Sequence, residues 1–452
     1  MFMQGMAARL RAILMGDGEF AMVLRGAGVA LVIRVLASAI GYASMILLAR
    51  WMGSSEYGHY SFAIAWMMLL AYPATLGLPG SAVRFVAQYA AAKDWPHVVG
   101  LLELSSWLVF GCGAVIALIT IPALLYFRAH LDPGYVAPTL VALAGIPVAA
   151  LGVVRSEAIR GLRWLGLSWT PLQLGQPLLL LSLAAAMMLI TAGLSATMVV
   201  GASIVASAAM LVAQWRVLRA RLGTRVRVEP KIDARLWLTT ALSFVWIYVA
   251  NVALAQAGII MVGFLLTPKD VALYSAAAAT SLLVTFPLLA ANALSAPRFA
   301  ALHAQQRQPE LQALVTDVAR WTFWPSLVIA VILAAFGSLV LRLFGPGFEQ
   351  GYLVLVILTF GQLVNAFAGP VGNLLNMTGY QAVTARVLGS TAILSVALGL
   401  VFTRMWGTVG TALAFSGGMV LWNAWLALLV VWKLDIYPSL LRPRNRSCAE
   451  EV

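Results

Sequence analysis

Apolar residues along this chain come in long stretches, each bounded by a short polar segment. A hydrocarbon core of about 30 Å needs roughly 20 apolar residues for each helix that crosses it. Stretches of that length recur often enough to predict an all-α polytopic membrane protein with about twelve transmembrane helices. The predicted spans are 24–50, 59–79, 99–126, 135–154, 168–191, 195–215, 237–265, 272–297, 319–343, 351–376, 383–403 and 408–432.

The two halves of the chain repeat one pattern. A shift of 214 residues lays one half over the other without a gap, and it aligns residue types that rarely match by chance. The aligned pairs are Tyr60 with Tyr274, Pro73 with Pro287, Arg84 with Arg298, Phe85 with Phe299, and Trp107 with Trp321. Since the same shift places six spans over six spans in the same orientation, the pattern predicts two six-helix bundles related by a parallel internal repeat.

These patterns divide the chain into five parts. We expect an interfacial segment on the cytoplasmic side (1–22), an N-terminal bundle (23–215), a basic cytoplasmic linker (216–235), a C-terminal bundle (236–433) and a cytoplasmic tail (434–452). The first residues lack the uninterrupted apolar core of a cleavable signal peptide, so a short helix at the membrane surface is the better interpretation.

Composition agrees with a lipid environment. Hydrophobic residues make up 62% of the chain and charged residues only 10%, whereas a soluble domain carries roughly 25% charged residues. Too few charges remain to cover a water-facing surface. The two cysteines, Cys112 and Cys448, have no metal-binding or redox spacing.

The basic residues indicate how the chain is oriented. With the N-terminus in the cytoplasm, 23 lysines and arginines fall on the cytoplasmic side, five fall on the opposite side, and Arg34 lies within a span. This asymmetry follows the positive-inside rule, and it places both termini in the cytoplasm. The formal charge of +13 therefore reflects short cytoplasmic loops, and we expect no nucleic-acid partner.

Enzymatic motifs are missing from the sequence. No lysine follows a glycine as in a nucleotide-binding P-loop, and neither an Asp-x-Asp pair nor a His-Glu-x-x-His motif occurs. No loop between spans is long enough for an appended catalytic domain. Duplicated six-helix bundles indicate a transporter that moves one bundle against the other, and we expect no cofactor, no metal and no catalytic residue.

Arg34 is the most informative polar residue inside a span. It lies nine residues after Arg25, so about 13 Å along the helix, where a charge must face water or a partner. The corresponding region of the seventh span carries Tyr248, Asn251 and Gln256. The pattern predicts a central cavity with a cation on one side and neutral hydrogen-bonding groups on the other. The alternative is that Arg34 extends toward the cytoplasmic headgroups.

Arg84 and Arg298 occupy equivalent places at the ends of the second and eighth spans. Each has a carboxylate nineteen residues later, Glu103 or Asp317. A salt bridge within each bundle and the binding of a substrate phosphate both account for this spacing.

The tenth span carries a face of amides and glycines at helical spacing, interrupted by Pro370. Gln362, Asn365 and Asn373 on this face could bind sugar hydroxyls or join helices by amide hydrogen bonds. Gln173 and Gln176, flanked by prolines in the fifth span, form a weaker version of the same pattern.

Several segments, in this order and spacing, resemble one family. They are residues 48–60 (LARWMGSSEYGHY), 76–78 (LGL), 82–85 (AVRF), 343–348 (LFGPGF) and 374–379 (LLNMTG). Together they resemble the bacterial polysaccharide-export proteins, the lipid-linked oligosaccharide flippases of the MATE-like superfamily.

The resemblance implies two six-helix lobes around a cationic cavity, in the bacterial inner membrane. It also implies translocation of an undecaprenyl-pyrophosphate-linked oligosaccharide from the cytoplasmic to the periplasmic leaflet. The expected partners are this carrier lipid and membrane lipids, and a polysaccharide polymerase and other assembly proteins are candidates. Glu103, Glu157 and Asp317 are candidates for ion coupling by chemistry alone. The rival functions are a multidrug antiporter of the same fold, a lipid II-type flippase and, in a different class, a membrane-embedded sugar-transfer enzyme.

Overall fold

The computed structural model describes residues 19–191, 193–223 and 228–438, and it describes side chains from residue 34 onward except at 130, 293, 294 and 297. Much of the expected interfacial segment, the centre of the linker and most of the tail lie outside these residues. Within them the chain is entirely helical. The helices of the first half are α2 (Glu19–Ala74), α3 (Leu78–Ala91), α4 (Trp95–Phe127), η1 (Arg128–His130), α5 (Pro133–Ala144), α6 (Ile146–Gly161), α7 (Leu165–Trp169), η2 (Thr170–Gly175), α8 (Gln176–Ile190) and α9 (Ala196–Leu222). Those of the second half are α10 (Ala234–Leu265), α11 (Pro268–Ser281), η4 (Leu282–Thr285), α12 (Phe286–Ala304), α13 (Gln308–Arg342), η5 (Phe348–Gly351), α14 (Tyr352–Ala368), α15 (Val371–Met377) and α16 (Gln381–Leu434).

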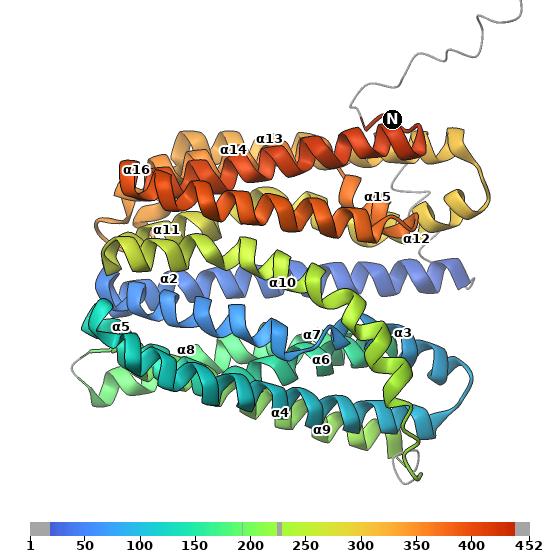
Figure 1. The fold of residues 1–452 in the computed structure, drawn as a ribbon, viewed down its shortest axis with the longest axis horizontal. Coiled ribbons are helices and arrows are strands. Elements are labelled where there is room, and N and C mark those ends of the chain that lie inside the picture. Colours follow the sequence, from blue (N-terminus) through green and yellow to red (C-terminus); the bar gives the residue numbers. More distant parts are fainter. Residues whose placement is uncertain (1–18, 192, 224–227, 439–452) are drawn as a thin grey trace, which may run out of the picture.

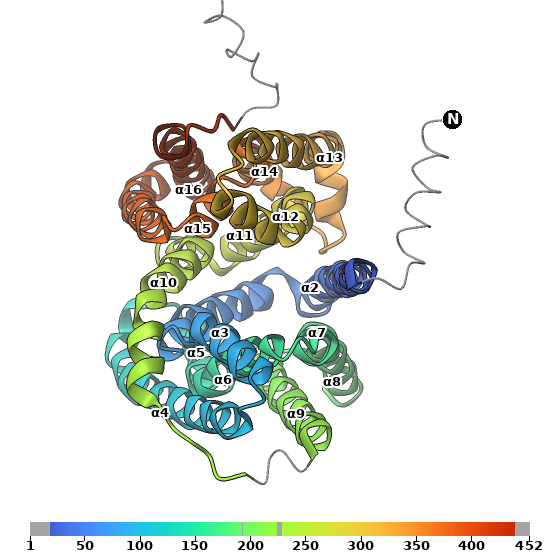
Figure 2. The ribbon, with the colours of Figure 1, turned by 90° about the vertical axis from the view of Figure 1, so that its right-hand side faces the viewer.

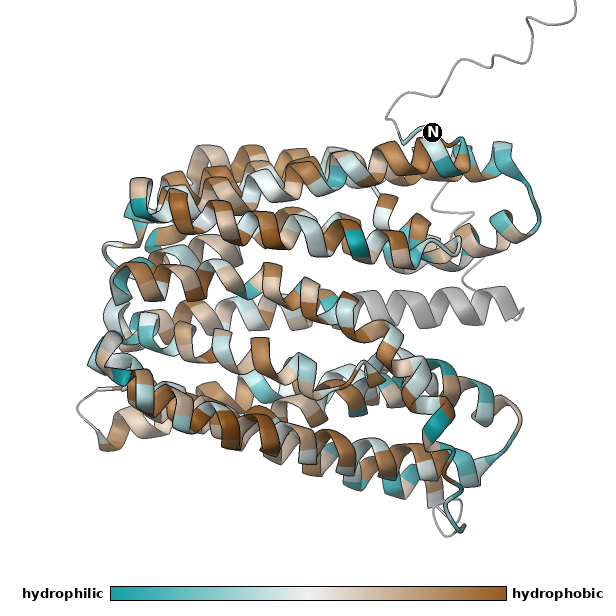
Figure 3. Ribbon diagram, in the orientation of Figure 1, coloured by the Kyte–Doolittle hydropathy of each residue, from teal (hydrophilic) through white to brown (hydrophobic). Residues whose placement is uncertain are grey.

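Nine of the described helical stretches are long and apolar enough to cross a membrane, or ten if the bent pair α5–α6 counts as one span. Their middle parts are mostly apolar, and polar residues gather toward the ends of the bundle (Figure 3). This confirms a polytopic all-α membrane protein. The count of twelve spans stays a prediction.

The two longest helices each contain a break where two predicted spans meet. In α2 the break is at Gly53, with a φ of 78°, and in α16 it is at Trp406 and Gly407. The arms of α16 pack against each other: the hydroxyls of Thr403 and Thr411 lie 2.7 Å apart. Figure 1 shows the chain reversing direction at both breaks. A glycine permits these turns because it adopts a positive φ without steric cost.

The helices form two groups. Viewed end-on, α3 to α9 lie on one side and α11 to α16 on the other, with the first arm of α2 and much of α10 between them (Figure 2). A single buried core joins the groups at the end of the molecule where α2 and α16 turn; it includes Tyr57 and Phe62 from the first half with Tyr274 and Phe348 from the second. Elsewhere the buried clusters belong largely to one group.

Residues 214 positions apart meet at the interface between the groups. The hydroxyl of Ser275 in α11 donates to the Ser61 hydroxyl in the second arm of α2, over 3.2 Å. These serines are counterparts in the repeat, and counterparts can touch only near an axis that exchanges the two halves. The contact therefore supports the parallel repeat and indicates where its two-fold axis passes.

Helix α10 does not remain with the second half along its whole length. Trp237 near its start is buried in a cluster of the N-terminal bundle, and its indole nitrogen donates to Tyr89 Oη over 3.1 Å. Farther along, Trp246 and Met261 of α10 pack against glycines of α16. The helix therefore bridges the two bundles, which the assignment of spans to halves did not anticipate.

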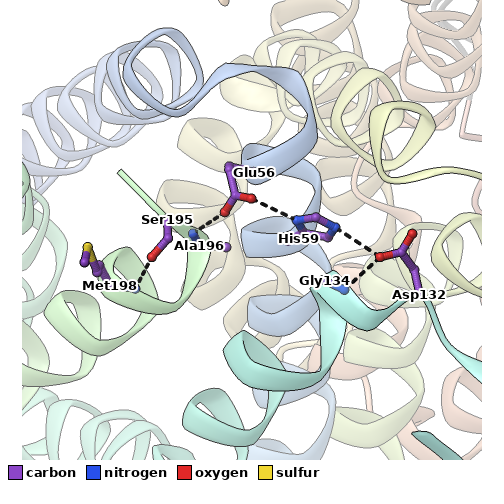
Figure 4. Close-up of polar contacts among 7 residues, drawn as sticks. All are labelled: Glu56, His59, Asp132, Gly134, Ser195, Ala196 and Met198. Atoms are coloured by element: carbon purple, nitrogen blue, oxygen red, sulfur yellow. Dashed lines mark hydrogen bonds and ion pairs between the residues drawn. The ribbon is translucent and has the colours of Figure 1, made fainter. Parts of the chain in front are cut away.

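Polar contacts tie three helices of the N-terminal bundle together at the turning end (Figure 4). Glu56 of α2 accepts a 2.6 Å hydrogen bond from the backbone nitrogen of Ala196, at the start of α9. Buried His59 lies 3.5 Å from Glu56 and 3.6 Å from Asp132, which itself caps α5 by accepting from Gly134. Carboxylates are favourable here because they face the positive ends of helix dipoles.

Candidate functional site

Among the described residues, each bundle contains a cavity lined by hydrogen-bonding groups. The cavity in the N-terminal bundle has a volume of about 430 Å³ and lies among α2, α6, α7, η2, α8 and α9. It is rich in groups that form hydrogen bonds. Its polar lining residues are Tyr60, Tyr72, Ser156, Glu157, Ser168, Gln173, Gln176, Ser203 and Ser207.

The cavity in the C-terminal bundle is smaller, about 210 Å³, and lies among α10, α11, α14 and α16. None of its described lining residues is charged. Its polar lining residues are Asn251, Tyr274, Ser281, Gln362 and Ser416.

The two cavities occupy equivalent places in the repeat. Tyr60 lines the first and its counterpart Tyr274 lines the second, and the same relation holds for Val148 and Gln362. Three further lining pairs, at positions 64, 67 and 68 with 278, 281 and 282, follow the same offset. The duplicated architecture therefore supplies these two cavities at equivalent positions, and of their described lining residues only Glu157, in the first, is charged.

A cluster of charged and aromatic side chains lies beside the first cavity. Glu157 of α6 forms an ion pair with Arg160, one helical turn later. Arg34 in the first arm of α2 lies within electrostatic range of both Glu157 and Arg160. Its guanidinium carbon is 5.8 Å from the centre of the Trp169 ring, a distance suited to a cation–π contact. Two cations and one carboxylate give this cluster a net charge of +1.

Tyrosines from both halves complete this cluster. The rings of Tyr72 and Tyr248 lie 6.4 Å apart. Both side chains lie within electrostatic range of the Glu157 carboxylate. Because Tyr248 is the repeat counterpart of Arg34, the two counterparts approach the same carboxylate from different bundles. The cluster thus lies where a movement of one bundle against the other would change its contacts.

Local breaks in two helices position these groups. The bend between α5 and α6 is 46°, and it follows Gly145 and precedes Pro147. Between α7 and α8, η2 is a π-helical turn that contains Pro171. Since a π-turn inserts an extra residue and rotates the side chains that follow, it contributes to bringing both Gln173 and Gln176 to the cavity wall.

The predicted site residues fall into two groups in the structure. Arg34, Tyr248 and Glu157 come together in the charged cluster. Asn251 and Gln362 come together in the smaller cavity. Among the described cavities, Gln256 and Asn365 line neither of these two; both are half-buried. Asn373 is engaged in packing, since its amide donates to Asn292 over 3.4 Å.

Of the two accounts of the arginine–carboxylate spacing, the salt bridge does not form, and phosphate binding stays a prediction. Within the described residues no ion pair joins Arg84 to Glu103 or Arg298 to Asp317. Both arginines are exposed, and they lie inside α3 and α12, which continue beyond the predicted span ends to Ala91 and Ala304. Glu103 lines a separate cleft on the outer face of the bundle.

Three residues of the charged cluster were missed by the sequence interpretation. Tyr72, Arg160 and Trp169 belong to different helices, and no spacing connects them. The one available signal was Arg160 three residues after Glu157, a helical spacing for an ion pair.

Two groups of apolar helices on either side of a shared interface define a membrane protein of MATE-like fold. Solved structures support this fold. A multidrug resistance transporter of the MATE family of the MOP superfamily, in an inward-facing conformation, aligns with a TM-score of 0.72 at 16% identity, over 90% of this chain and 98% of that chain. Lipid II flippase MurJ, in an inward closed conformation, gives 0.68 at 9% identity, over 91% and 88%. A MOP superfamily transporter from Pyrococcus furiosus, described by a reversed polarity of its binding pocket, gives 0.62 at 16% identity, over 94% and 97%.

The chain belongs to the family described as polysaccharide biosynthesis protein, which it matches over residues 23–303, more than half of its length. A comparison with curated proteins gives no match. The family match and the fold together confirm the resemblance.

Proposed function

We propose that this protein is a flippase that moves an undecaprenyl-pyrophosphate-linked oligosaccharide from the cytoplasmic to the periplasmic leaflet. The proposed site of action is the bacterial inner membrane, with both termini in the cytoplasm. The supporting observation is the cluster of Arg34, Glu157 and Arg160 at the interface between the bundles, in a member of a polysaccharide biosynthesis family.

The cluster suits an anionic head group. The guanidinium groups of Arg34 and Arg160 outnumber the single carboxylate, and a guanidinium forms strong, paired hydrogen bonds with phosphate oxygens. Gln173 and Gln176 in the adjoining cavity offer both donors and acceptors to sugar hydroxyls. The apolar outer surface of the helices would leave the lipid tail in the membrane.

Alternating access then follows from the repeat. The bundles pack closely at the turning end, where the Ser61–Ser275 contact lies, and the charged cluster lies farther along the interface. Tilting the bundles against each other, about an axis in the membrane plane, would expose the cluster first to one side of the membrane and then to the other. A polysaccharide polymerase and other assembly proteins are the partners that would consume the delivered oligosaccharide.

The substitution Arg34→Ala tests this proposal. Charge-assisted hydrogen bonds contribute about 1.5–3 kcal/mol each, so we expect export to fall roughly tenfold to a hundredfold. Arg34→Lys should retain part of the activity, because it keeps the charge and loses the planar fork. The measurement is complementation of a flippase-deficient strain, with the membrane level of each variant quantified. Full export by Arg34→Ala at normal protein levels would contradict the proposal.

A second candidate function is an ion-coupled multidrug antiporter. Glu157 lines the larger cavity, and a carboxylate in that position could accept a cationic compound. The ion pair with Arg160 argues against this, because it neutralises the only charge of the right sign. Export of a cationic dye that depends on Glu157 and is insensitive to Arg34→Ala would favour the antiporter.

A further inference from the structure

A third cleft lies on the outer face of the N-terminal bundle, away from both cavities. It has a volume of about 430 Å³ and is formed by α4, α6 and α9, of which α4 and α9 lie at the margin of the molecule (Figure 2). Its chemistry differs from the apolar surface around it. The residues that give it this character are Glu103, Ser106, Trp107, Arg155, Trp215 and Arg219.

Two arginines in this cleft stack on one indole. The guanidinium carbon of Arg155 lies 4.9 Å from the centre of the Trp215 ring, and that of Arg219 lies 4.8 Å from it. The two guanidinium carbons are therefore no more than 9.7 Å apart. Within the described residues neither arginine has a carboxylate within ion-pair distance, although Glu103 lines the same cleft. An anion within reach of both guanidinium groups would offset the repulsion between these like charges.

The hydrogen bonds of Arg155 leave donors available. Its terminal nitrogens donate to the Leu211 carbonyl and the Ser106 hydroxyl, each over 3.5 Å, at the outer limit for a hydrogen bond. Its Nε is buried and has no acceptor in the described part of the chain. Arg219 is exposed at the mouth of the cleft. A charged donor fixed in the wall and another at the rim form a built site for an oxyanion.

The depth of the cleft indicates the source of that oxyanion. Arg155 lies six residues before the end of α6, and Trp215 lies seven before the end of α9, so both are about 10 Å from the ends of their helices. Those ends are on the side that the basic residues predict to be cytoplasmic. Trp107 is 77% exposed beside the cleft, and exposed tryptophans gather at the level of lipid headgroups.

We propose that this cleft binds the phosphate headgroup of an anionic phospholipid from the cytoplasmic leaflet. Arg155 and Arg219 hold the phosphate, Ser106 lies within its reach, and Trp107 borders the acyl chains. Lys433 and Trp321 of the C-terminal bundle correspond to Arg219 and Trp107. The wall of the cleft is not repeated there, because Gly369 and Leu429 occupy the positions that correspond to Arg155 and Trp215. The site is therefore a property of one bundle, and it does not depend on which substrate the protein transports.

Native mass spectrometry of the purified full-length protein tests the proposal. Phosphatidylglycerol and phosphatidylcholine with identical acyl chains are added in equal amounts, and the bound fractions are compared. We expect phosphatidylglycerol to be favoured by the wild type, and the preference to fall about fivefold in Arg219→Ala, equivalent to about 1 kcal/mol for one basic residue at a membrane surface. The double variant with Arg155→Ala should lose the preference.

Arg216→Ala is the matched control. Arg216 is also an exposed arginine of α9, and it does not line the cleft, so its removal should leave the preference unchanged. Arg219→Ala keeps the test valid if Arg155→Ala does not fold, because its side chain is exposed. An equal loss in Arg216→Ala would indicate general surface charge and would overturn the proposal. So would binding of inorganic phosphate at this cleft without any preference between the two lipids, since the site would then serve a soluble anion.

Discussion

The cavities of the two bundles are built on the same positions of the repeat and differ in charge. Tyr60 and Tyr274 occupy corresponding walls, yet the charged residues of the first cavity and its surroundings are replaced by uncharged ones in the second. The pairs of counterparts are Arg34 and Tyr248, Glu157 and Val371, and Arg160 and Leu374. The comparison teaches that the repeat supplies similar positions for both cavities, whereas the residues at those positions give a charge to only one of them. If the difference in charge also divides the work of the two cavities, substitutions in the first should impair transport more than substitutions in the second.

The largest effect is expected where the two bundles touch most closely. A Cβ on Gly58 would lie 1.8 Å from the carbonyl oxygen of Pro268, and backbone atoms cannot move aside as a flexible side chain can. The counterpart Ala272 already carries a Cβ and is fully buried. Gly58→Ala should therefore destabilise this packed arrangement of the bundles, whereas Ala272→Gly should preserve it.

A cysteine pair reports on that arrangement. Cysteines at Ser61 and Ser275, whose hydroxyls lie 3.2 Å apart, should cross-link in a background that lacks Cys112 and Cys448. We expect Gly58→Ala to lower the yield at least about tenfold, which corresponds to about 1.4 kcal/mol. An unchanged cross-linking yield at normal protein levels would show that the interface can accommodate a methyl group at Gly58.

The second prediction compares the amides of the two cavities. Replacing Gln173 and Gln176 with leucine removes hydrogen-bonding groups from the larger cavity, and at about 0.5–1.5 kcal/mol per bond export should fall roughly tenfold. Gln362→Val introduces the residue type found at its counterpart, Val148, and should change export less than about twofold. Complementation with matched protein levels measures both. Equal losses would mean that both cavities contact the substrate.

The third prediction concerns the net positive charge of the cluster formed by Arg34, Glu157 and Arg160. Glu157→Val gives the first bundle the residue of the second, and it leaves Arg34 and Arg160 without a carboxylate. The partly exposed position limits the effect to about 1 kcal/mol, so affinity for a short-chain lipid pyrophosphate should rise about fivefold. Isothermal titration calorimetry on the purified protein measures this affinity. A fall in affinity would instead assign Glu157 a direct part in substrate binding.

The smallest effect is expected at the axis of the repeat. Ser275 donates to Ser61 and also to the carbonyl of Ala272, over 3.1 Å. Ser61→Ala leaves that second bond intact, so the free energy of unfolding should fall by only about 0.5 kcal/mol. Ser275→Ala removes the donor of both bonds and should cost more. Unfolding in mixed micelles would compare the two free energies. A reversed order would show that Ser61 contributes more through its contact with Tyr57 than Ser275 does through its hydrogen bonds.

The fold could be predicted from the sequence because it depends on long, continuous segments of the chain. Apolar stretches and the offset of 214 residues are visible without any contact information, and each predicted span overlaps a helix. The bridging position of α10 was not visible, because Trp237 is apolar like its neighbours and only the packed structure shows which bundle buries it.

The candidate site was accessible only in part. Arg34 could be recognised because a charge inside a span requires a partner. Its neighbours Arg160 and Trp169 could not, because their approach depends on the bend before α6 and the π-turn after α7. For Arg84 and Arg298 the nineteen-residue spacing suggested a pair that the helices do not form, since each arginine projects from a helix that extends past the predicted span end.

The contact between Ser61 and Ser275 also has a consequence for symmetry. An assembly of two identical chains must carry the same residue at every pair of corresponding positions. In such a dimer Arg34 would face a second arginine where Tyr248 now lies, and each Glu157 would have a twin. Joining both halves in one polypeptide removes that restriction while keeping the shared axis on which the serines meet. The covalent link thus permits the guanidinium of Arg34 on one side of the interface and the phenol of Tyr248 on the other. A homodimer of identical chains cannot have this asymmetry.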